Sequence, residues 1–125
     1  MDRVDITGFS SLFRNLARDR REHVGLMFGK ANRVLVYSPL KNEARVDHLF
    51  TGDPWDTVIA FTSTERYGLE LVGVFHTHPC GKPRPSQYDI EGMRRWPYIW
   101  VIASPYGIKA WRYTDKGIVE IGVVA

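Results

Sequence analysis

Residues 73–89 read GVFHTHPCGKPRPSQYD, and this stretch sets the fold and the chemistry of the chain. The apolar residues before His76 predict a strand, and a strand places residues i and i+2 on the same face. His76 and His78 are therefore expected side by side where the strand ends. Ser86 predicts a helix start that carries Asp89 in its first turn. Two imidazoles and one carboxylate suit a catalytic zinc site, which leaves a fourth position for water.

Each half of this stretch also has a simpler interpretation. Ser86 followed three residues later by Asp89 is an ordinary helix-capping pattern that needs no metal. Two histidines at a strand end are a weak signal alone, because histidine has many other uses in proteins. The two patterns together, between His76 and Asp89, favour a metal site.

The spacing of these residues resembles the HxHPx(6)SxxD signature of the JAMM (MPN+) metalloproteases. His76, His78, Pro79, Ser86 and Asp89 all stand in register with it. The resemblance implies an α/β fold in one domain, with a mixed β-sheet flanked by helices as in cytidine deaminases. It also implies a zinc ion (Zn²⁺) bound by His76, His78 and Asp89.

Members of this family also carry an upstream glutamate before a short glycine-containing strand. Residues 21–29, REHVGLMFG, look like that element, and Glu22 is then the matching acid. Without the resemblance Glu22 would be an ordinary solvated charge beside a basic run. Residues 52–73 resemble the helix that links the two motifs in the family, and the stretch 41–53 stands where larger members hold a substrate-gripping insertion.

The resemblance implies a zinc-dependent hydrolase that cuts isopeptide or peptide bonds after the C-terminal tail of a ubiquitin-like or sulfur-carrier protein. Glu22 would take a proton from the zinc-bound water and pass it to the leaving amine, and Ser86 would hydrogen-bond the oxygen of the tetrahedral intermediate. Three alternatives stay open at this point: an isopeptidase, a hydrolase that processes the C-terminus of a sulfur carrier in cofactor or cysteine biosynthesis, and a metal-free scaffold of the same fold.

Composition is consistent with a small enzyme. The chain has 125 residues, of which 44% are hydrophobic, and this predicts one domain over residues 1–125 with a substantial core. We expect no secretion signal and no membrane span, and hence a cytoplasmic protein. Cys80 is the only cysteine, which favours a reducing compartment and leaves its own role open.

The net charge of +3 is modest, and four arginines fall within residues 14–21. We interpret them as a solvated face and expect no nucleic-acid partner. The apolar last strand, residues 118–124, is expected to belong to the core, with a free edge for self-pairing as the alternative. Oligomeric state is open.

Periodicity and turn residues predict the order of the elements. Helices are expected over residues 10–20, 53–68 and 86–96. Strands are expected over residues 24–28, 33–37, 69–76, 98–103, 108–113 and 118–124. The two strands over residues 69–76 and 98–103 are apolar at successive positions, as is typical of central strands covered on both faces.

Overall fold

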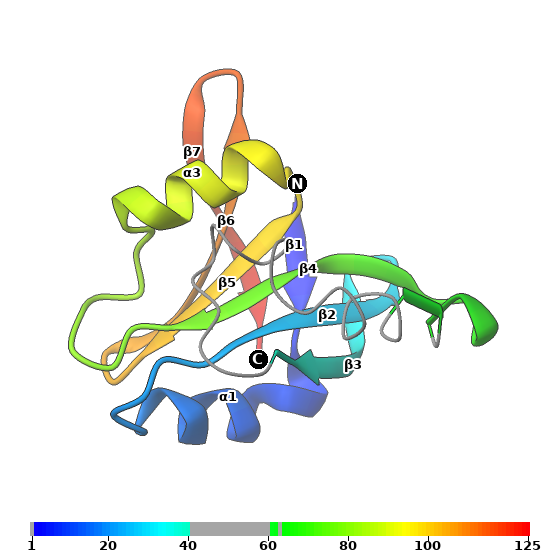
Figure 1. Cartoon of the computed structure of the whole chain (residues 1–125), viewed down its shortest axis with the longest axis horizontal. Helices are drawn as coiled ribbons and strands as arrows, with labels where there is room; N and C mark the ends of the chain where they lie inside the picture. Colours follow the sequence, from blue (N-terminus) through cyan, green and yellow to red (C-terminus); the bar gives the residue numbers. More distant parts are fainter. Residues whose placement is uncertain (1, 41–60, 63) are drawn as a thin grey trace.

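The computed structural model describes residues 2–40, 61–62 and 64–125. Its elements follow in the order β1 (Arg3–Asp5), the 3₁₀ turn η1 (Thr7–Phe9), α1 (Ser10–Ala17), β2 (Val24–Lys30), β3 (Arg33–Pro39), β4 (Glu70–Thr77), α3 (Gln87–Arg95), β5 (Ile99–Ser104), β6 (Gly107–Thr114) and β7 (Gly117–Val124). The strands form one sheet, and the helices pack against it, as shown in Figure 1. The α/β class is confirmed, and among the described residues so is the predicted order of the elements from α1 onward; β1 and η1 were not predicted.

The sheet is mixed and closes on itself in the order β1-β3-β2-β4-β5-β6-β7. β4 and β5 run parallel, whereas β2 is antiparallel to both of its neighbours. Gly73 of β4 pairs with Ile99 of β5, and a Cβ atom at position 73 would collide with the carbonyl oxygen of Ile99. The close approach of β4 to β5 therefore depends on a residue without a side chain.

Closure of the sheet was not predicted, since it depends on the three-residue β1. This strand pairs in parallel with the last residues of β7 and, through Asp5 and Arg33, with β3. A strand this short has no periodicity that a sequence can reveal. It covers the edge of β7 over residues 122–124, so the last strand is part of the closed sheet.

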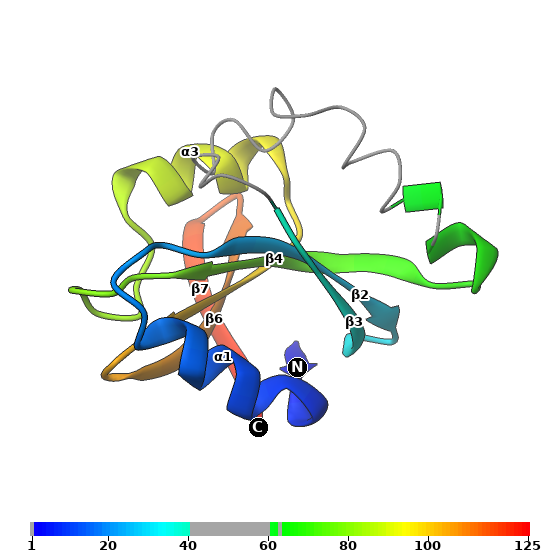
Figure 2. The ribbon, with the colours of Figure 1, turned by 60° about the horizontal axis from the view of Figure 1, so that its bottom comes forward.

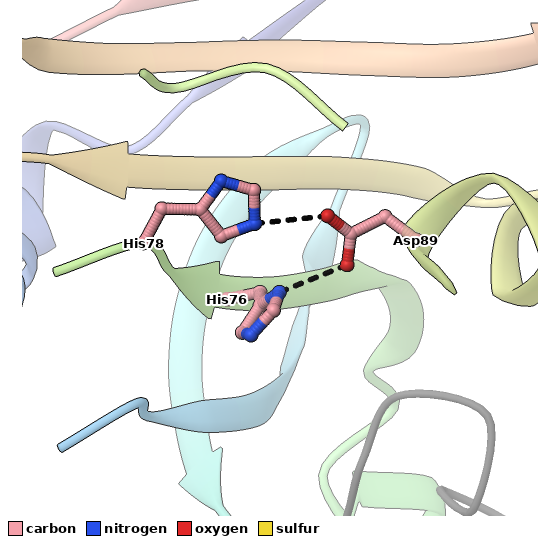
Figure 3. Close-up of side chains that lie close together, drawn as sticks. All are labelled: His76, His78 and Asp89. Atoms are coloured by element: carbon pink, nitrogen blue, oxygen red, sulfur yellow. Dashed lines mark hydrogen bonds and ion pairs between the residues drawn. The ribbon is translucent and has the colours of Figure 1, made fainter. Parts of the chain in front are cut away.

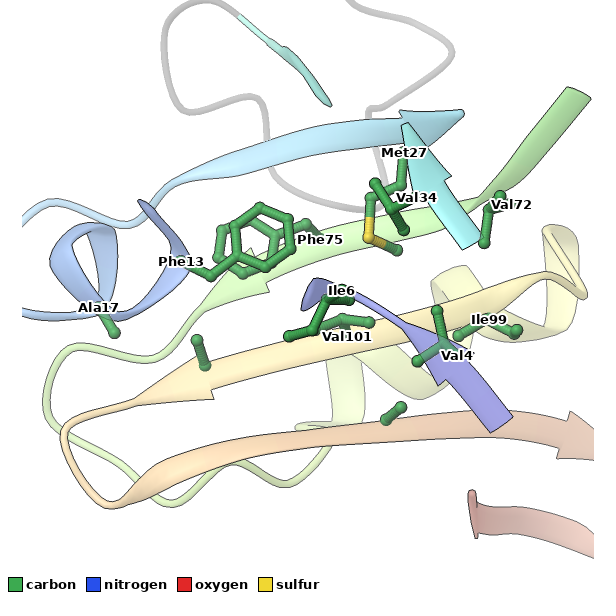
Figure 4. Packing of buried hydrophobic residues seen from close by; sticks show 12 residues of the cluster. Val4, Ile6, Phe13, Ala17, Met27, Val34, Val72, Phe75, Ile99 and Val101 are labelled. Atoms are coloured by element: carbon green, nitrogen blue, oxygen red, sulfur yellow. The ribbon is translucent and has the colours of Figure 1, made fainter. Parts of the chain in front are cut away.

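Helices α1 and α3 cover opposite faces of the sheet, as Figure 2 shows. The α1 face packs Phe13 and Ala17 against apolar residues of the central strands, including Phe75 and Val101 (Figure 4). The α3 face packs Met93 against Trp100 and their neighbours. Because both faces are covered, all six residues of β5 are buried, as the sequence predicts.

Several element ends differ from the predicted ones. α1 ends at Ala17 with Arg18 as its cap, three residues before the predicted end. The turn between β2 and β3 contains only Ala31 and Asn32, both with positive φ, so β2 continues to Lys30, beyond its predicted end. β3 begins at Arg33 as predicted and continues two residues further than predicted, to Pro39. Such a tight turn matches the right-handed twist of the strands it connects.

A further helical segment precedes β4, at residues 61–62 and 64–66. It ends at Gly68, where φ is +68° and the Gly68 and Leu69 amides donate to the carbonyls of Glu65 and Thr64. This is the Schellman arrangement that glycine favours, and it confirms the predicted end of this helix. The predicted helix start at residues 53–54 and the stretch 41–53 lie outside the described residues. Within the described residues, no helix is both long and apolar enough to cross a membrane.

Candidate metal centre

The end of β4 positions two histidines on one side of the sheet. Val24 of β2 stands opposite His76 in the antiparallel register, and both side chains belong to the α3 face. His78 follows two residues later, and its amide donates to the carbonyl of Ala103 at 2.8 Å, so the chain keeps its extended course beside β5. Thr77, between the two histidines, points to the opposite face. The predicted juxtaposition of His76 and His78 is confirmed.

Helix α3 brings the carboxylate of Asp89 to this strand end. Ser86 caps the helix: its side chain accepts from the Asp89 amide at 3.2 Å, and its own amide donates to Asp89 Oδ2 at 2.8 Å. The simpler interpretation of these residues as a capping box is therefore correct. The same carboxylate also contacts both histidines, so the cap holds Asp89 in the orientation that the site needs.

The three side chains converge closely (Figure 3). His76 Nδ1 lies 2.9 Å from Asp89 Oδ1, and His78 Nε2 lies 2.9 Å from Asp89 Oδ2. One nitrogen or oxygen atom from each residue lies within 4.8 Å of the others. Two imidazoles and a carboxylate at this spacing are a donor set that a divalent metal ion can share.

The contacts of the histidines test whether a cation fits here. His76 Nε2 lies 3.4 Å from Glu22 Oε2, and His78 Nδ1 lies 3.0 Å from the carbonyl oxygen of Lys82. Each imidazole thus faces an acceptor oxygen at both of its nitrogens, yet a neutral imidazole has only one N–H to donate. A cation held between the rings and Asp89 would relieve this surplus of acceptors, and the Lys82 carbonyl would then orient His78.

Asp89 is buried and remains ionised. Burial alone would raise the pKa of its carboxyl group, but hydrogen bonds from His76, His78 and the Ser86 amide hold that pKa well below the usual value. Burial likewise opposes protonation of His78, while its contact with Asp89 raises the pKa of the imidazole on balance. The negative charge of Asp89 is the dominant electrostatic feature of the site, and it favours a bound cation.

Glu22 reaches the site from the segment between α1 and β2. Its carboxylate contacts His76 from the side opposite Asp89, and 62% of its side chain is exposed. It therefore faces open space above the histidines rather than the core. The structure brings together all five residues that the sequence singled out: Glu22, His76, His78, Ser86 and Asp89.

A pocket of about 620 Å³ surrounds this group of residues. Arg20 and Tyr88 line it and were not identified from the sequence, because neither belongs to a recognisable spacing. Cys80 is also on its wall, exposed and unpaired. The contact of His78 with the Lys82 carbonyl was missed too, since a backbone atom leaves no trace in residue identities.

Comparison with known proteins shows the family to which this chain belongs. The profile of the prokaryotic homologs of the JAB domain (Prok-JAB) matches residues 12–114. The chain belongs to this family. The matched range of the Prok-JAB domain contains every residue of the metal centre described above.

Two curated relatives of this Prok-JAB protein carry functional names. The desampylase of Pyrococcus furiosus is 41% identical over 105 residues, which cover 82% of this chain and 75% of the relative. The probable TtuB-protein conjugate cleaving protease of Thermus thermophilus is 34% identical over 93 residues, covering 72% of this chain and 60% of the relative. The second name describes a protease that cleaves conjugates of the protein TtuB.

Solved structures share the fold of the Prok-JAB protein at lower identity. A protein from Desulfitobacterium hafniense superposes with a TM-score of 0.74 at 21% identity, over 98% of this chain and 92% of that protein. A JAB1/MPN domain protein from Archaeoglobus fulgidus gives a TM-score of 0.63 at 18% identity, over 99% and 98% of the two chains. These similarities confirm the JAB/MPN fold expected from the sequence.

Proposed function

We propose that this protein is a zinc-dependent isopeptidase that releases a ubiquitin-like or sulfur-carrier protein from the lysine of a target by cutting after its C-terminal tail. The observation that carries the proposal is the convergence of His76, His78 and Asp89 in a pocket that Glu22 and Ser86 also line. The desampylase relative, 41% identical, supports the same class of substrate. The activity is proposed for one domain, residues 1–125, in the cytoplasm.

His76, His78 and Asp89 would hold the metal through two nitrogens and one carboxylate oxygen. When bound, zinc lowers the pKa of a coordinated water toward neutrality and polarises a substrate carbonyl. The buried, ionised Asp89 contributes a full negative charge to this ligand set. Its cap on α3 fixes the carboxylate, and the Lys82 carbonyl fixes His78, so both ligands are oriented before metal binds.

Glu22 is the general base of the proposed reaction. Its Oε2 atom lies on the open side of His76, where it accepts a proton from the attacking water and then donates it to the leaving amine nitrogen. Ser86 Oγ accepts from the Asp89 amide, which leaves its own hydrogen free to donate to the substrate carbonyl oxygen as negative charge develops there. No group of the enzyme forms a covalent bond with the substrate in this scheme.

Mass spectrometry of a defined conjugate tests the proposal. The substrate is a ubiquitin-like protein joined through its C-terminal glycine to the lysine side chain of a peptide. It is incubated with the zinc-loaded wild type and with Glu22→Gln, a variant that keeps the size of the side chain and all three metal ligands. We expect cleavage after the terminal glycine by the wild type, with kcat of the variant about 10²–10⁴ lower.

A linear extension of the same protein, ending in a peptide bond after the glycine, is assayed in parallel. Cleavage of this substrate alone would make the protein a C-terminal processing hydrolase rather than an isopeptidase. If neither substrate is cleaved and zinc does not bind in stoichiometric amounts, the protein is a non-catalytic scaffold of the family. Full activity in Glu22→Gln would exclude Glu22 as the base.

A further inference from the structure

The segment that carries Glu22 connects the two faces of the sheet. α1 lies on one face and α3, which carries Asp89, lies on the other, and residues 18–23 run from the end of α1 to the start of β2 (Figures 1 and 2). The carboxylate of Glu22 is 62% exposed and contacts His76 at 3.4 Å. Within the part of the chain that the structure describes, this long contact is the one that Glu22 makes through its side chain, and it does little to fix the position of an exposed carboxylate. The backbone of this segment must therefore set where Glu22 lies.

Thr77 holds that backbone from the opposite face of the strand. The register of β2 and β4 pairs Val24 with His76, and its continuation places His23 opposite Thr77. The Thr77 amide donates to the His23 carbonyl at 2.9 Å, as in an ordinary strand ladder. The His23 amide, however, donates to the hydroxyl oxygen of Thr77 at 2.7 Å. The side chain of Thr77, which is completely buried, thus closes the last ring of the ladder.

This closure determines the direction of the neighbouring side chain. Residues that alternate along an extended segment point to opposite faces, so Glu22 shares the face of Val24 and His76 while His23 takes the other face. His23 is held there a second time, because its Nε2 atom lies 2.9 Å from Asp19 Oδ2. The amide of Arg21 also donates to Asp19, at 3.2 Å. The two residues on either side of Glu22 are therefore anchored.

We propose that Thr77 is a positioning residue that holds Glu22 beside the metal ligands through the backbone of His23. The inference rests on the proposed function, in which Glu22 is the general base. Thr77 lies between His76 and His78 in the sequence, so one short stretch orients the metal ligands on one face and the base from the other. A hydroxyl at position 77 is required for this, whereas an apolar side chain of the same shape would leave the His23 amide without its acceptor.

Two variants separate the hydroxyl from the shape of the side chain. Thr77→Val keeps the branched shape and removes the acceptor, and Thr77→Ser keeps the acceptor. Amide hydrogen exchange, followed by NMR on the protein without substrate, measures the contact directly. We expect the His23 amide to exchange at least about tenfold faster in Thr77→Val, with Val101 unchanged and with Thr77→Ser close to the wild type. Unchanged exchange at His23 in Thr77→Val would overturn the proposal.

Kinetics on the conjugate then test the consequence for catalysis. In Thr77→Val we expect kcat to fall about 10- to 100-fold, with KM within about twofold and full zinc content, because a base displaced by a fraction of an ångström loses its alignment. In the Glu22→Gln background the same change should have no further effect on kcat, since Thr77 acts only through Glu22. An equal loss in both backgrounds would mean that Thr77 has a general structural role.

The two measurements also separate this inference from the proposed function. If the wild type cleaves no conjugate, the function fails, and Thr77 then has no catalytic base to position even where exchange shows the contact. If the wild type is active and only the hydrogen-exchange prediction fails, the function stands and the positioning role of Thr77 is wrong.

Discussion

Helices α1 and α3 are attached to the same sheet by different kinds of interaction. α1 has no side-chain cap, and its main anchor is Phe13, whose ring stacks on Phe75 with centroids 3.8 Å apart. α3 begins with a capping box, and the acid of that box, Asp89, is completely buried against two histidines. Burial of apolar side chains holds α1 on the sheet, whereas the first turn of α3 is held by the contacts of the charged Asp89 carboxylate.

The difference separates stability from metal binding by face. Residues of the α1 face contribute to the free energy of unfolding, whereas the first turn of α3 also carries Asp89, a proposed metal ligand. A change on the α1 face should therefore lower the free energy of unfolding without changing the affinity for metal. A change in the first turn of α3 should lower the affinity for metal, with or without a loss of stability. Four substitutions, taken from the largest expected effect to the smallest, test this separation.

Asp89→Asn should have the largest effect. It keeps the shape of the side chain but removes the charge that attracts the cation, and we expect zinc affinity to fall by more than about 100-fold with loss of detectable hydrolysis. Metal content after dialysis, measured by mass spectrometry, gives the result. Glu91→Gln on the same helix, at an exposed position, is the matched control and should bind zinc normally. Stoichiometric zinc in Asp89→Asn would mean that the ligand set is wrong.

Phe13→Ala tests the other helix. Removal of a completely buried ring that stacks on Phe75 should lower the free energy of unfolding by about 3–5 kcal/mol, measured by urea denaturation of the metal-free protein. Leu12, on the same helix but 42% exposed, provides the control: Leu12→Ala should cost much less. At urea concentrations below its unfolding midpoint, Phe13→Ala should still bind one zinc ion. A loss of metal affinity in the folded variant would contradict the separation of the two faces.

Ser86→Ala should lower both the stability of the protein and its kcat by moderate amounts. Loss of the N-cap should cost about 1 kcal/mol of stability, and loss of the hydroxyl donor should lower kcat by about 10²–10³. Ser86→Thr restores a hydroxyl that can both cap and donate, so it should recover most of both. If Ser86→Ala loses stability but keeps kcat, Ser86 serves only as a cap.

Tyr37→Phe on the α1 face should have the smallest effect, and one that depends on pH. Burial raises the pKa of the Tyr37 phenol from 10.0 to about 12, and within the described residues its hydroxyl has no hydrogen-bond partner. Because the raised pKa favours the folded state only while the phenol is protonated, the wild type should lose stability as pH rises from about 10 toward about 12. Tyr37→Phe should lose less over this range and should gain up to about 1 kcal/mol at neutral pH. Parallel pH profiles of the melting temperature in both proteins would contradict this.

The sequence was sufficient for the parts of the molecule that rest on local spacing. The strand before His76, the proline after His78 and the cap at Ser86 are close in the chain, so their geometry follows from alternation and capping rules. Glu22 lies far from them in sequence and was found through family resemblance, because an isolated acid beside arginines carries no signal of its own.

Other features depend on tertiary contacts that residue types do not encode. β1 is a strand because β3 and β7 present edges to it, and its three residues would not be one elsewhere. Thr77 looks like any strand residue until the fold places the His23 amide against its hydroxyl. Tyr88 and Arg20 line the pocket although neither belongs to a motif that the sequence reveals.

The closing strand has a consequence for the order in which the chain assembles. β1 pairs with Gly122 to Val124 of β7, and all the other helices and strands lie between these two segments in the sequence. A contact between such distant segments carries the highest loop-closure entropy in the sheet and is expected to form late in folding. Until this contact forms, residues 122–124 of β7 lack their partner strand, and the cylinder stays open between β1 and β7.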